Sequence, residues 1–511
     1  MIDALLLPIA LLYFLVSAIL FTFGLNFLYL TWRAWREGRQ MPPTPPPLAE
    51  WPHVTVQLPI YNEMYVAKRI IAAAVKLDYP ANRLQIQVTD DSTDETREIV
   101  RQEVARWQAQ GVNISHLHRT DRSGYKAGAL QAAMPEATGE FIAIFDADFV
   151  PPPDFLRRTL PHFLDEKTAF VQARWGHLNR NYSWLTYLQS LAIDGHFMIE
   201  QFARSRAGFW FNFNGTAGVW RRAAMEDAGG WTADTLTEDL DLSYRAHLRG
   251  WHGRYLRDLV VPGEIPPSFS GFRKQQHRWA RGSLECARKL APQVWRAPIP
   301  FRQKLQATLH LTGYTVHLLL FVLTLIYPLV ALFTARYAHL STLYGLAYLF
   351  ALTSIAPTLF FLVGQQQLGR LRWRQLPKIL AISVVGSGLM LNTARAAWQI
   401  WRQPDGVFER TAKFGLEEKG QDWRRQKYQL RFDPIVYPEL ALGVYSLWTA
   451  WLAVSLESWG IVFYAFLFGI GLIFAAATTI WQTISVYHRQ KGVKEIGDRR
   501  LEIDQSPISN L

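Results

Sequence analysis

The chain has 511 residues, of which 50% are hydrophobic and 14% aromatic, and its net charge is +12. This length predicts two or more domains, and the apolar content indicates membrane spans. The single cysteine, Cys286, excludes a disulfide framework within the chain. Positive charge alone would suit a nucleic acid, but basic residues that flank membrane spans explain it, so we expect no nucleic-acid partner.

The N-terminal region indicates a retained membrane anchor. Residues 5–30 are apolar over the length that a bilayer requires, and the basic stretch TWRAWREGRQ follows them. A secretory signal would instead carry its positive charges before a shorter apolar core. Because positive charge stays on the cytoplasmic side, we expect a transmembrane helix with residue 31 inside, followed by a proline-rich linker.

The next region alternates short apolar strands with amphipathic helices. The stretches VTVQLPIYNE, LQIQVTDDS, ISHLHR and FIAIFDAD are typical of strands, and YVAKRIIAAAVKL and ETREIVRQEVARWQAQ are typical of helices. This alternation predicts an α/β domain with a mostly parallel sheet. Such a sheet binds its ligand at the carboxyl ends of its strands.

Acidic residues gather where these strands end. Asp146 and Asp148 follow an apolar strand at a spacing of two, which places both carboxylates on one face. Adjacent carboxylates repel each other unless a cation or a proton lies between them. No histidine or cysteine cluster accompanies the pair, so the oxygen ligands indicate Mg²⁺ or Mn²⁺ rather than zinc. The sequence has no Gly-Lys-Ser/Thr phosphate loop, so we expect the metal to be shared with a nucleotide donor.

Apolar segments return in the C-terminal half. Residues 309–333 and 343–364 predict one pair of spans, and residues 437–456 and 460–481 a second pair, with basic loops on the cytoplasmic side. Residues 379–400 have basic flanks at both ends, and we interpret them as an interfacial or re-entrant helix, which gives five spans in all. The expected segments are a transmembrane helix (1–32), the linker (33–52), a cytoplasmic catalytic domain (53–268), interfacial helices (269–304), two spans (305–364), the interfacial or re-entrant helix with a loop (365–433), two spans (434–484) and a cytoplasmic tail (485–511).

A set of short motifs runs from residue 59 to residue 279 in the order PIYNE, DDST, YKAGAL, DAD, FNFNGTAG, TED and QQHRW. With membrane spans around it, this ordered set resembles membrane-embedded family-two glycosyltransferases of the cellulose-synthase-like kind. FNFNGTAGVWR with QQHRW is most similar to the plant mannan-synthase and xyloglucan-backbone-synthase branches. The resemblance implies a GT-A-type nucleotide-sugar-binding domain, a multi-span helical membrane region, and a metal-dependent hexosyltransferase that uses UDP-glucose or GDP-mannose.

The resemblance also implies a role for the residues of each motif. Asp239 of TED is the expected catalytic base, and Asp146 and Asp148 are the expected ligands of Mg²⁺ or Mn²⁺. Arg410 stands where the gating-loop pattern of the family has valine. The expected donor-binding residues are Pro59, Tyr61, Glu63, Asp90, Asp91, Lys126, Asp146, Gln275, Arg278 and Trp279, the expected acceptor-binding residues are Asn214, Gly215, Thr216, Glu238 and Trp279, and the expected gating loop contains Phe408, Thr411 and Lys413.

One base without a separate nucleophile predicts a single displacement that inverts the sugar carbon. Two products fit these residues: a β-linked polysaccharide of glucan or mannan type that the spans export, or a single β-sugar on diacylglycerol, a sphingolipid or a polyprenyl phosphate. A transporter that binds nucleotide sugars without catalysis is a third reading, which the complete acidic motif set disfavours. We expect the catalytic domain on the cytoplasmic side of a plasma or inner membrane. The sequence leaves the donor, the linkage position and any accessory subunit open.

Overall fold

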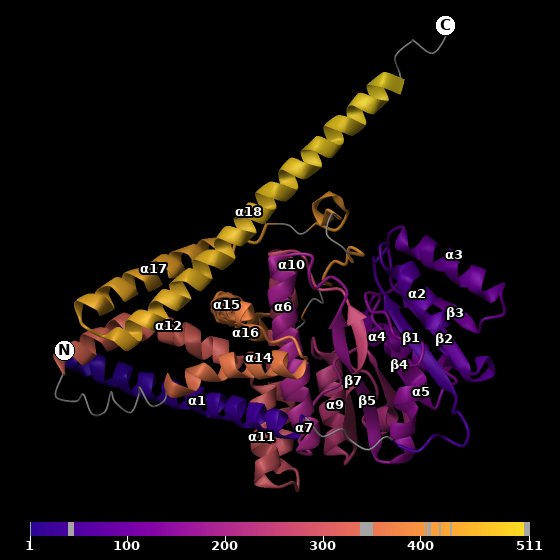
Figure 1. The fold of residues 1–511 in the computed structure, drawn as a ribbon, viewed down its shortest axis with the longest axis horizontal. Helices are drawn as coiled ribbons and strands as arrows, with labels where there is room; N and C mark the ends of the chain where they lie inside the picture. The colour runs from indigo at the N-terminus through magenta and orange to yellow at the C-terminus, as the bar shows by residue number, and fades with distance from the viewer. Residues whose placement is uncertain are drawn as a thin grey trace.

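The computed structural model describes residues 2–38, 45–337, 351–403, 406, 410–417, 421–429 and 432–504. An α/β domain occupies one side of the molecule and a bundle of long helices the other, with α6 and α10 between them (Figure 1). The long helix α18 leaves the bundle and projects beyond both parts (Figure 1). The two parts agree with the predicted fold class.

A seven-stranded sheet forms the centre of the α/β domain within the described residues, in the order β3-β2-β1-β4-β6-β5-β7. Strands β1 to β4 are parallel neighbours, which confirms the prediction of a mostly parallel sheet. The exception is β6, which runs antiparallel to both β4 and β5. The strands are β1 (Val54–Ile60), β2 (Leu84–Asp90), β3 (Ile114–His118), β4 (Phe141–Ile144), β5 (Thr168–His177), β6 (Gly218–Arg221) and β7 (His252–Gly263).

Both faces of the sheet are buried, which explains the nearly continuous apolar runs of the strands. On β4, Ile142 and Ile144 pack on one face while Phe141 and Ala143 pack on the other, as the alternation of a strand requires. The helices of this domain are α2 (Ala67–Val75), α3 (Thr96–Gln108), α4 (Tyr125–Ala133), α5 (Phe155–Thr159), α8 (Arg222–Asp227) and α9 (Glu238–Leu248), with short turns η1 (Ala81–Arg83), η2 (Met134–Glu136) and η3 (Leu160–Leu164).

The mixture of aromatic and basic residues at 182–205 and 269–290 also predicts amphipathic helices at the membrane surface, and both segments are helical. Residues 182–205 contain α6 (Trp184–Gly195), the π-helical turn η4 (His196–Gln201) and α7 (Phe202–Arg206). Residues 269–290 lie within α10 (Phe269–Arg296). Their expected place at the membrane surface stays a prediction.

The helical bundle has its own apolar core, formed between α1, α12, α16, α17 and α18. Its elements are α1 (Ile2–Glu37), α11 (Phe301–Leu311), α12 (Thr315–Arg336), η6 (Leu352–Ile355), α14 (Ala356–Gln367), η7 (Trp373–Gln375), α15 (Leu376–Ser387), α16 (Met390–Arg402), η8 (Trp423–Arg425), α17 (Val436–Ser455) and α18 (Trp459–Asp504). The order of helices follows the predicted apolar segments, and part of the segment at residues 343–364 lies outside the described residues.

Within the described part of the chain, four helical stretches are long and apolar enough to cross a membrane: Leu7–Glu37, Thr315–Arg336, Trp373–Arg402 and Trp459–Arg489. Three of them overlap the predicted spans at residues 5–30, 309–333 and 460–481. The predicted span at residues 437–456 corresponds to α17, which is not among the four. The stretch Trp373–Arg402 covers the residues that we interpreted as an interfacial or re-entrant helix, and the chain divides it into η7, α15 and α16. Length and composition do not separate a span from a re-entrant helix, so that interpretation stays a prediction.

Candidate active site

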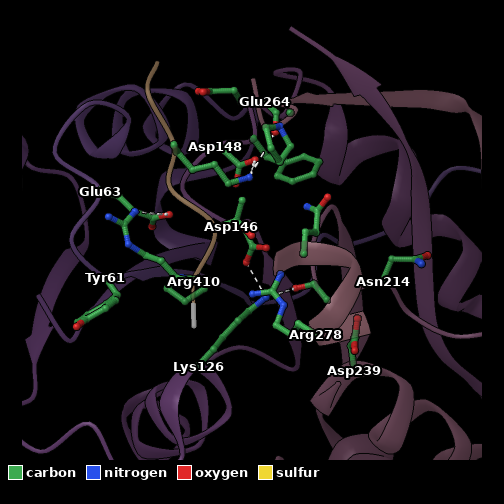
Figure 2. Close-up of a pocket in the computed structure, with 18 of the residues that line it drawn as sticks. Tyr61, Glu63, Lys126, Asp146, Asp148, Asn214, Asp239, Glu264, Arg278 and Arg410 are labelled. Atoms are coloured by element: carbon green, nitrogen blue, oxygen red, sulfur yellow. Dashed lines mark hydrogen bonds and ion pairs between the residues drawn. The ribbon is translucent and has the colours of Figure 1, made fainter. Parts of the chain in front are cut away.

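One pocket collects most of the residues that the motifs singled out (Figure 2). It lies at the carboxyl ends of β1, β2, β4 and β7, where α9, α10 and the chain at residues 410–413 close its sides. Ligand sites of α/β sheets form at this edge because the strand ends leave a crevice there. The predicted site residues that line it are Pro59, Tyr61, Glu63, Asp91, Lys126, Asp146, Asp148, Asn214, Gly215, Glu238, Asp239, Gln275, Arg278, Trp279, Thr411 and Lys413.

Two predicted site residues that the structure describes, Asp90 and Thr216, are not part of this lining. Asp90 is fully buried and its carboxylate faces His116 and His118 on β3, because neighbouring residues of a strand point in opposite directions. Thr216 is also buried, and its Oγ1 accepts a hydrogen bond from the backbone N–H of Asp146 at 2.8 Å. Thr216 therefore holds the DAD motif in place. Phe408 lies outside the described residues.

Lys126 connects the DAD motif with the TED motif. Its Nζ lies 2.6 Å from Asp146 Oδ1 and 3.6 Å from Glu238 Oε1, and it donates a hydrogen bond to the carbonyl of Gly215 at 2.9 Å. Burial favours the neutral amine, but the charges of Asp146 and Glu238 outweigh it and raise the pKa of Lys126 above its ordinary value. Lys126 is therefore a permanent positive charge between the two acidic motifs (Figure 2).

Asp239 lies in the first turn of α9 and faces the glycine of the FNFNGTAG motif. Gly215 has a φ of +75°, and a Cβ built on it would lie 3.0 Å from Asp239 Oδ2. Only glycine adopts this backbone conformation without strain and leaves that space open. Burial, and then the charge of Glu238, raise the pKa of Asp239 to about 7. A carboxylate with such a pKa is suited to accept a proton near neutral pH.

The QQHRW motif presents one face of α10 to the pocket. Gln275, Arg278 and Trp279 follow the i, i+3, i+4 spacing of a single helical face, and all three line the pocket. The same helix approaches the TED motif closely, since a Cβ on Gly282 would lie 2.8 Å from the backbone nitrogen of Thr237. The small residue at position 282 therefore lets α10 and the start of α9 form one wall.

The chain at residues 410–417 covers the DAD motif. Lys413 Nζ lies 2.5 Å from Asp148 Oδ2, and Arg410 Nη1 lies 3.7 Å from Glu63 Oε1 (Figure 2). Glu264 fixes this loop, because its two carboxylate oxygens accept the backbone N–H groups of Phe414 and Gly415, each at 2.9 Å. The sequence analysis missed Glu264, whose side chain is almost fully buried. In the sequence, Glu264 differs from its neighbours only as an acidic residue within the stretch VPGEIPP, near the end of the expected catalytic domain (53–268).

Besides Asp239, two further pocket carboxyl groups have raised pKa values. The pKa of Glu63 is raised to about 7, mainly by burial and also by the charges of Asp148 and Asp146, while the charge of Arg410 opposes the shift. Burial also raises the pKa of Glu264 to about 7. Burial is the main cause of both shifts, and the charge of Asp148 adds to each. Groups with perturbed pKa values concentrate at functional sites.

A stack of aromatic and basic groups forms the end of the pocket beside Asp91. The Arg122 guanidinium lies 3.5 Å from the centre of the Tyr61 ring and 4.9 Å from the centre of the Tyr125 ring. Asp91 is held by Arg119, which donates from Nε at 2.8 Å and from Nη2 at 2.7 Å. Flat groups of this kind suit a nucleobase. Arg122 was also missed, although it stands four residues before Lys126 in DRSGYK.

The backbone around the pocket adopts unusual conformations. Asn62, Tyr125 and Ala217 have positive φ values of 52°, 51° and 58° although none is glycine. Asn62 is held there by hydrogen bonds to the DDST loop, since its N–H donates to Ser92 Oγ and its Oδ1 accepts from the Thr93 N–H. Such strained residues persist where the surrounding structure fixes them, and they concentrate at functional sites.

The mostly parallel sheet, with acidic motifs at its strand ends, is a GT-A-type nucleotide-sugar-binding fold. A search of solved structures supports this class: a mannosyltransferase from Pyrobaculum calidifontis, solved in complex with GDP-Man and Mn²⁺, superimposes with a TM-score of 0.53. The two proteins are 22% identical, and the match covers 77% of this chain and 99% of the other. At this identity the likeness concerns the fold.

Residues 52–282 match the family described as "Glycosyltransferase like family 2", so this part of the chain is a family-two glycosyltransferase domain. Glucomannan 4-beta-mannosyltransferase 7 of Arabidopsis thaliana is 48% identical over 254 residues, which are 49% of this chain and 46% of that protein. Probable glucomannan 4-beta-mannosyltransferase 9 of Oryza sativa subsp. japonica is 46% identical over 251 residues, 48% of each chain. The match thus spans about half the length of these curated relatives.

Proposed function

We propose that this chain is an inverting glycosyltransferase that takes a hexose from a nucleotide-diphospho-sugar and extends a β-linked polysaccharide of mannan or glucan type at a membrane. One observation carries the proposal: Lys126 contacts Asp146 of the DAD motif at 2.6 Å and Glu238, the neighbour of Asp239, at 3.6 Å. The donor motif and the base motif therefore share one pocket. Sugar transfer requires this proximity, because the donor carbon and the acceptor hydroxyl must meet.

In this mechanism Asp239 accepts the proton of the acceptor hydroxyl as that oxygen attacks the sugar carbon. Its pKa of about 7 gives it the basicity that this step needs. The diphosphate leaves from the opposite side of the carbon, and the positive charges of Lys126 and Arg278 stabilise the charge that develops on it. A single displacement converts an α-linked donor into a β-linked product.

The pocket fits a divalent cation at Asp146 and Asp148. Both side chains offer carboxylate oxygens, the ligand type that Mg²⁺ and Mn²⁺ prefer. The ammonium groups of Lys126 and Lys413 lie 2.6 Å and 2.5 Å from these carboxylates, which shows that the place attracts positive charge. A bound Mg²⁺ or Mn²⁺ would supply further stabilisation of the negative charge on the departing diphosphate.

For the donor we propose GDP-mannose over UDP-glucose. This choice is supported by the two plant relatives, both of which are named as glucomannan 4-beta-mannosyltransferases. The test is a competition assay in which purified protein receives equal amounts of radiolabelled GDP-mannose and UDP-glucose. We expect mannose to be incorporated preferentially, and preferential incorporation of glucose would reject this donor.

The acceptor is proposed to be a growing glycan, with the helical bundle providing its route through the membrane. The support is the arrangement of the bundle beside the pocket, where α10 contributes both to the catalytic wall and to the contact with α16. Product analysis separates this proposal from the transfer of one sugar to a lipid. A long, insoluble product is expected, whereas a labelled monosaccharide that extracts into organic solvent would identify a lipid acceptor.

A further inference from the structure

A second cluster of possible metal ligands lies at the edge of the sheet, outside the donor pocket. Asp90 ends β2, and His116 and His118 lie on the neighbouring strand β3. The two histidines are two residues apart, so both rings project from the same face of β3. In the parallel register His118 stands opposite Asp90, and His116 stands opposite Val88.

The three side chains converge on one point. His116 Nε2 lies 2.9 Å from Asp90 Oδ2, and His118 Nδ1 lies 3.3 Å from the same oxygen. All three ligand atoms lie within 4.8 Å of one another. The other oxygen of Asp90 accepts the N–H of Ser92 at 2.8 Å, which orients Oδ2 toward the two rings. In the part of the chain that the structure describes, this is the one group of three or more His, Cys, Asp or Glu side chains with such spacing.

We propose that Asp90, His116 and His118 form a transition-metal site, with Zn²⁺ as the expected ion. Zinc bonds of about 2.0 to 2.1 Å in a tetrahedron place neighbouring ligand atoms about 3.3 Å apart. The separations of 2.9 and 3.3 Å from the Asp90 oxygen agree with that geometry. Two imidazole nitrogens and one carboxylate suit zinc, whereas Mg²⁺ and Mn²⁺ prefer oxygen ligands. Three protein ligands leave one position for water.

The site is accessible although its carboxylate is not. Asp90 is fully buried, while the side chains of His116 and His118 are 14% and 16% exposed. A metal ion can therefore reach the imidazole nitrogens from the surface and bind the buried carboxylate behind them. Since β3 is the last strand on this edge of the sheet, no further strand of the described sheet covers the site.

The residues that follow Asp90 and His118, at the ends of β2 and β3, connect the metal site to the donor pocket. Asp91 follows Asp90 and lines the pocket, while Arg119 follows His118 and holds Asp91 with two hydrogen bonds of 2.8 and 2.7 Å. The Arg119 N–H also donates to the Asp90 carbonyl at 2.9 Å. A metal ion that links β2 to β3 at Asp90 would therefore fix the Asp91–Arg119 pair at the nucleobase end of the pocket.

The experiment is a titration of full-length protein, purified in detergent and treated with EDTA, with Zn²⁺ by calorimetry and with Co²⁺ by visible absorption. We expect one equivalent of Zn²⁺ in the presence of millimolar Mg²⁺, a Co²⁺ spectrum of tetrahedral type, and a rise in the melting temperature on zinc addition. The double variant H116A/H118A should bind at least about 100-fold more weakly, because loss of outer-shell partners alone costs about 10- to 100-fold. The control H53A removes an exposed histidine elsewhere and should bind as the wild type does.

The single variant H118Q keeps a polar side chain and tests the site should the double variant fail to fold. Its zinc affinity is expected to fall while its melting temperature without metal stays near that of the wild type. Absence of stoichiometric zinc in the wild type, or equal binding in H118Q, would overturn the proposal. The cluster would then be a carboxylate that accepts hydrogen bonds from two imidazoles. This binding test does not depend on the proposed glycosyltransferase activity.

Discussion

The loop at residues 410–417 should lose its position over the pocket when Glu264 is replaced by alanine. Glu264 accepts the N–H groups of Phe414 and Gly415 at 2.9 Å each. Above about pH 8 the Glu264 carboxylate is ionised, because its pKa is about 7. A hydrogen bond to a charged group contributes about 1.5 to 3 kcal/mol. Because the released N–H groups regain water, we take about 3 kcal/mol for the pair, at the low end of this range. Since 1.4 kcal/mol corresponds to a factor of ten, the docked loop should become about 100-fold less favoured relative to the undocked one.

Amide hydrogen exchange of the purified enzyme measures this directly, because Phe414 and Gly415 exchange when the loop opens. We expect their exchange in E264A to be about 100-fold faster, with a raised KM for the donor and more hydrolysis of donor relative to transfer. The matched control is Glu417→Ala, which removes an exposed ion pair between the last residue of the same loop and Arg69 (Nη1–Oε1, 2.8 Å). Such a pair contributes about 0 to 1 kcal/mol, so E417A should change little.

The reasoning fails if E264A shows wild-type exchange at both amides and a wild-type KM. Equal changes in amide exchange and KM in E417A and E264A would likewise contradict this role, because the Glu264 carboxylate would then contribute no more to the position of the loop than the exposed ion pair does.

Three further outcomes are expected. In the free enzyme kcat/KM should rise as the pH increases through about 7, because only ionised Asp239 accepts the proton. The variant D239N should lower kcat about 10²- to 10⁴-fold and remove this pH dependence. An unchanged pH profile in D239N would exclude Asp239 as the base. EDTA should abolish sugar transfer in the wild type, and added Mn²⁺ or Mg²⁺ should restore it. In D146A the added metal should not restore transfer. Full activity of the wild type in EDTA would rule out the metal. G282A should lower kcat and reduce the free energy of unfolding, measured with denaturant, by about 1 to 3 kcal/mol, because its Cβ would lie 2.8 Å from the Thr237 nitrogen. A wild-type kcat and a wild-type free energy of unfolding in G282A would show that α10 moves freely.

The sequence by itself determined the local elements and the identity of most pocket residues. The sequence predicted strands that end before Asp91 and before Asp146 and Asp148, with a site at their carboxyl ends. This prediction was possible because the periodicity of a strand and the acidic residues at its end are local properties of the sequence. The spacing in QQHRW likewise placed Gln275, Arg278 and Trp279 on one helical face. The resemblance to family-two enzymes added the roles that no local pattern contains.

Only the tertiary structure decided which polar groups meet. Lys413 and Asp148 are 265 residues apart in the chain, and Glu264 and Gly415 are 151 apart, so their contacts depend on how α10 and the helical bundle pack against the sheet. The antiparallel β6 was likewise invisible to local patterns, because strand direction is set by the path of the chain. Asp90 and Asp91 are neighbours in sequence, yet the pleat of β2 turns one toward two histidines and the other toward the pocket.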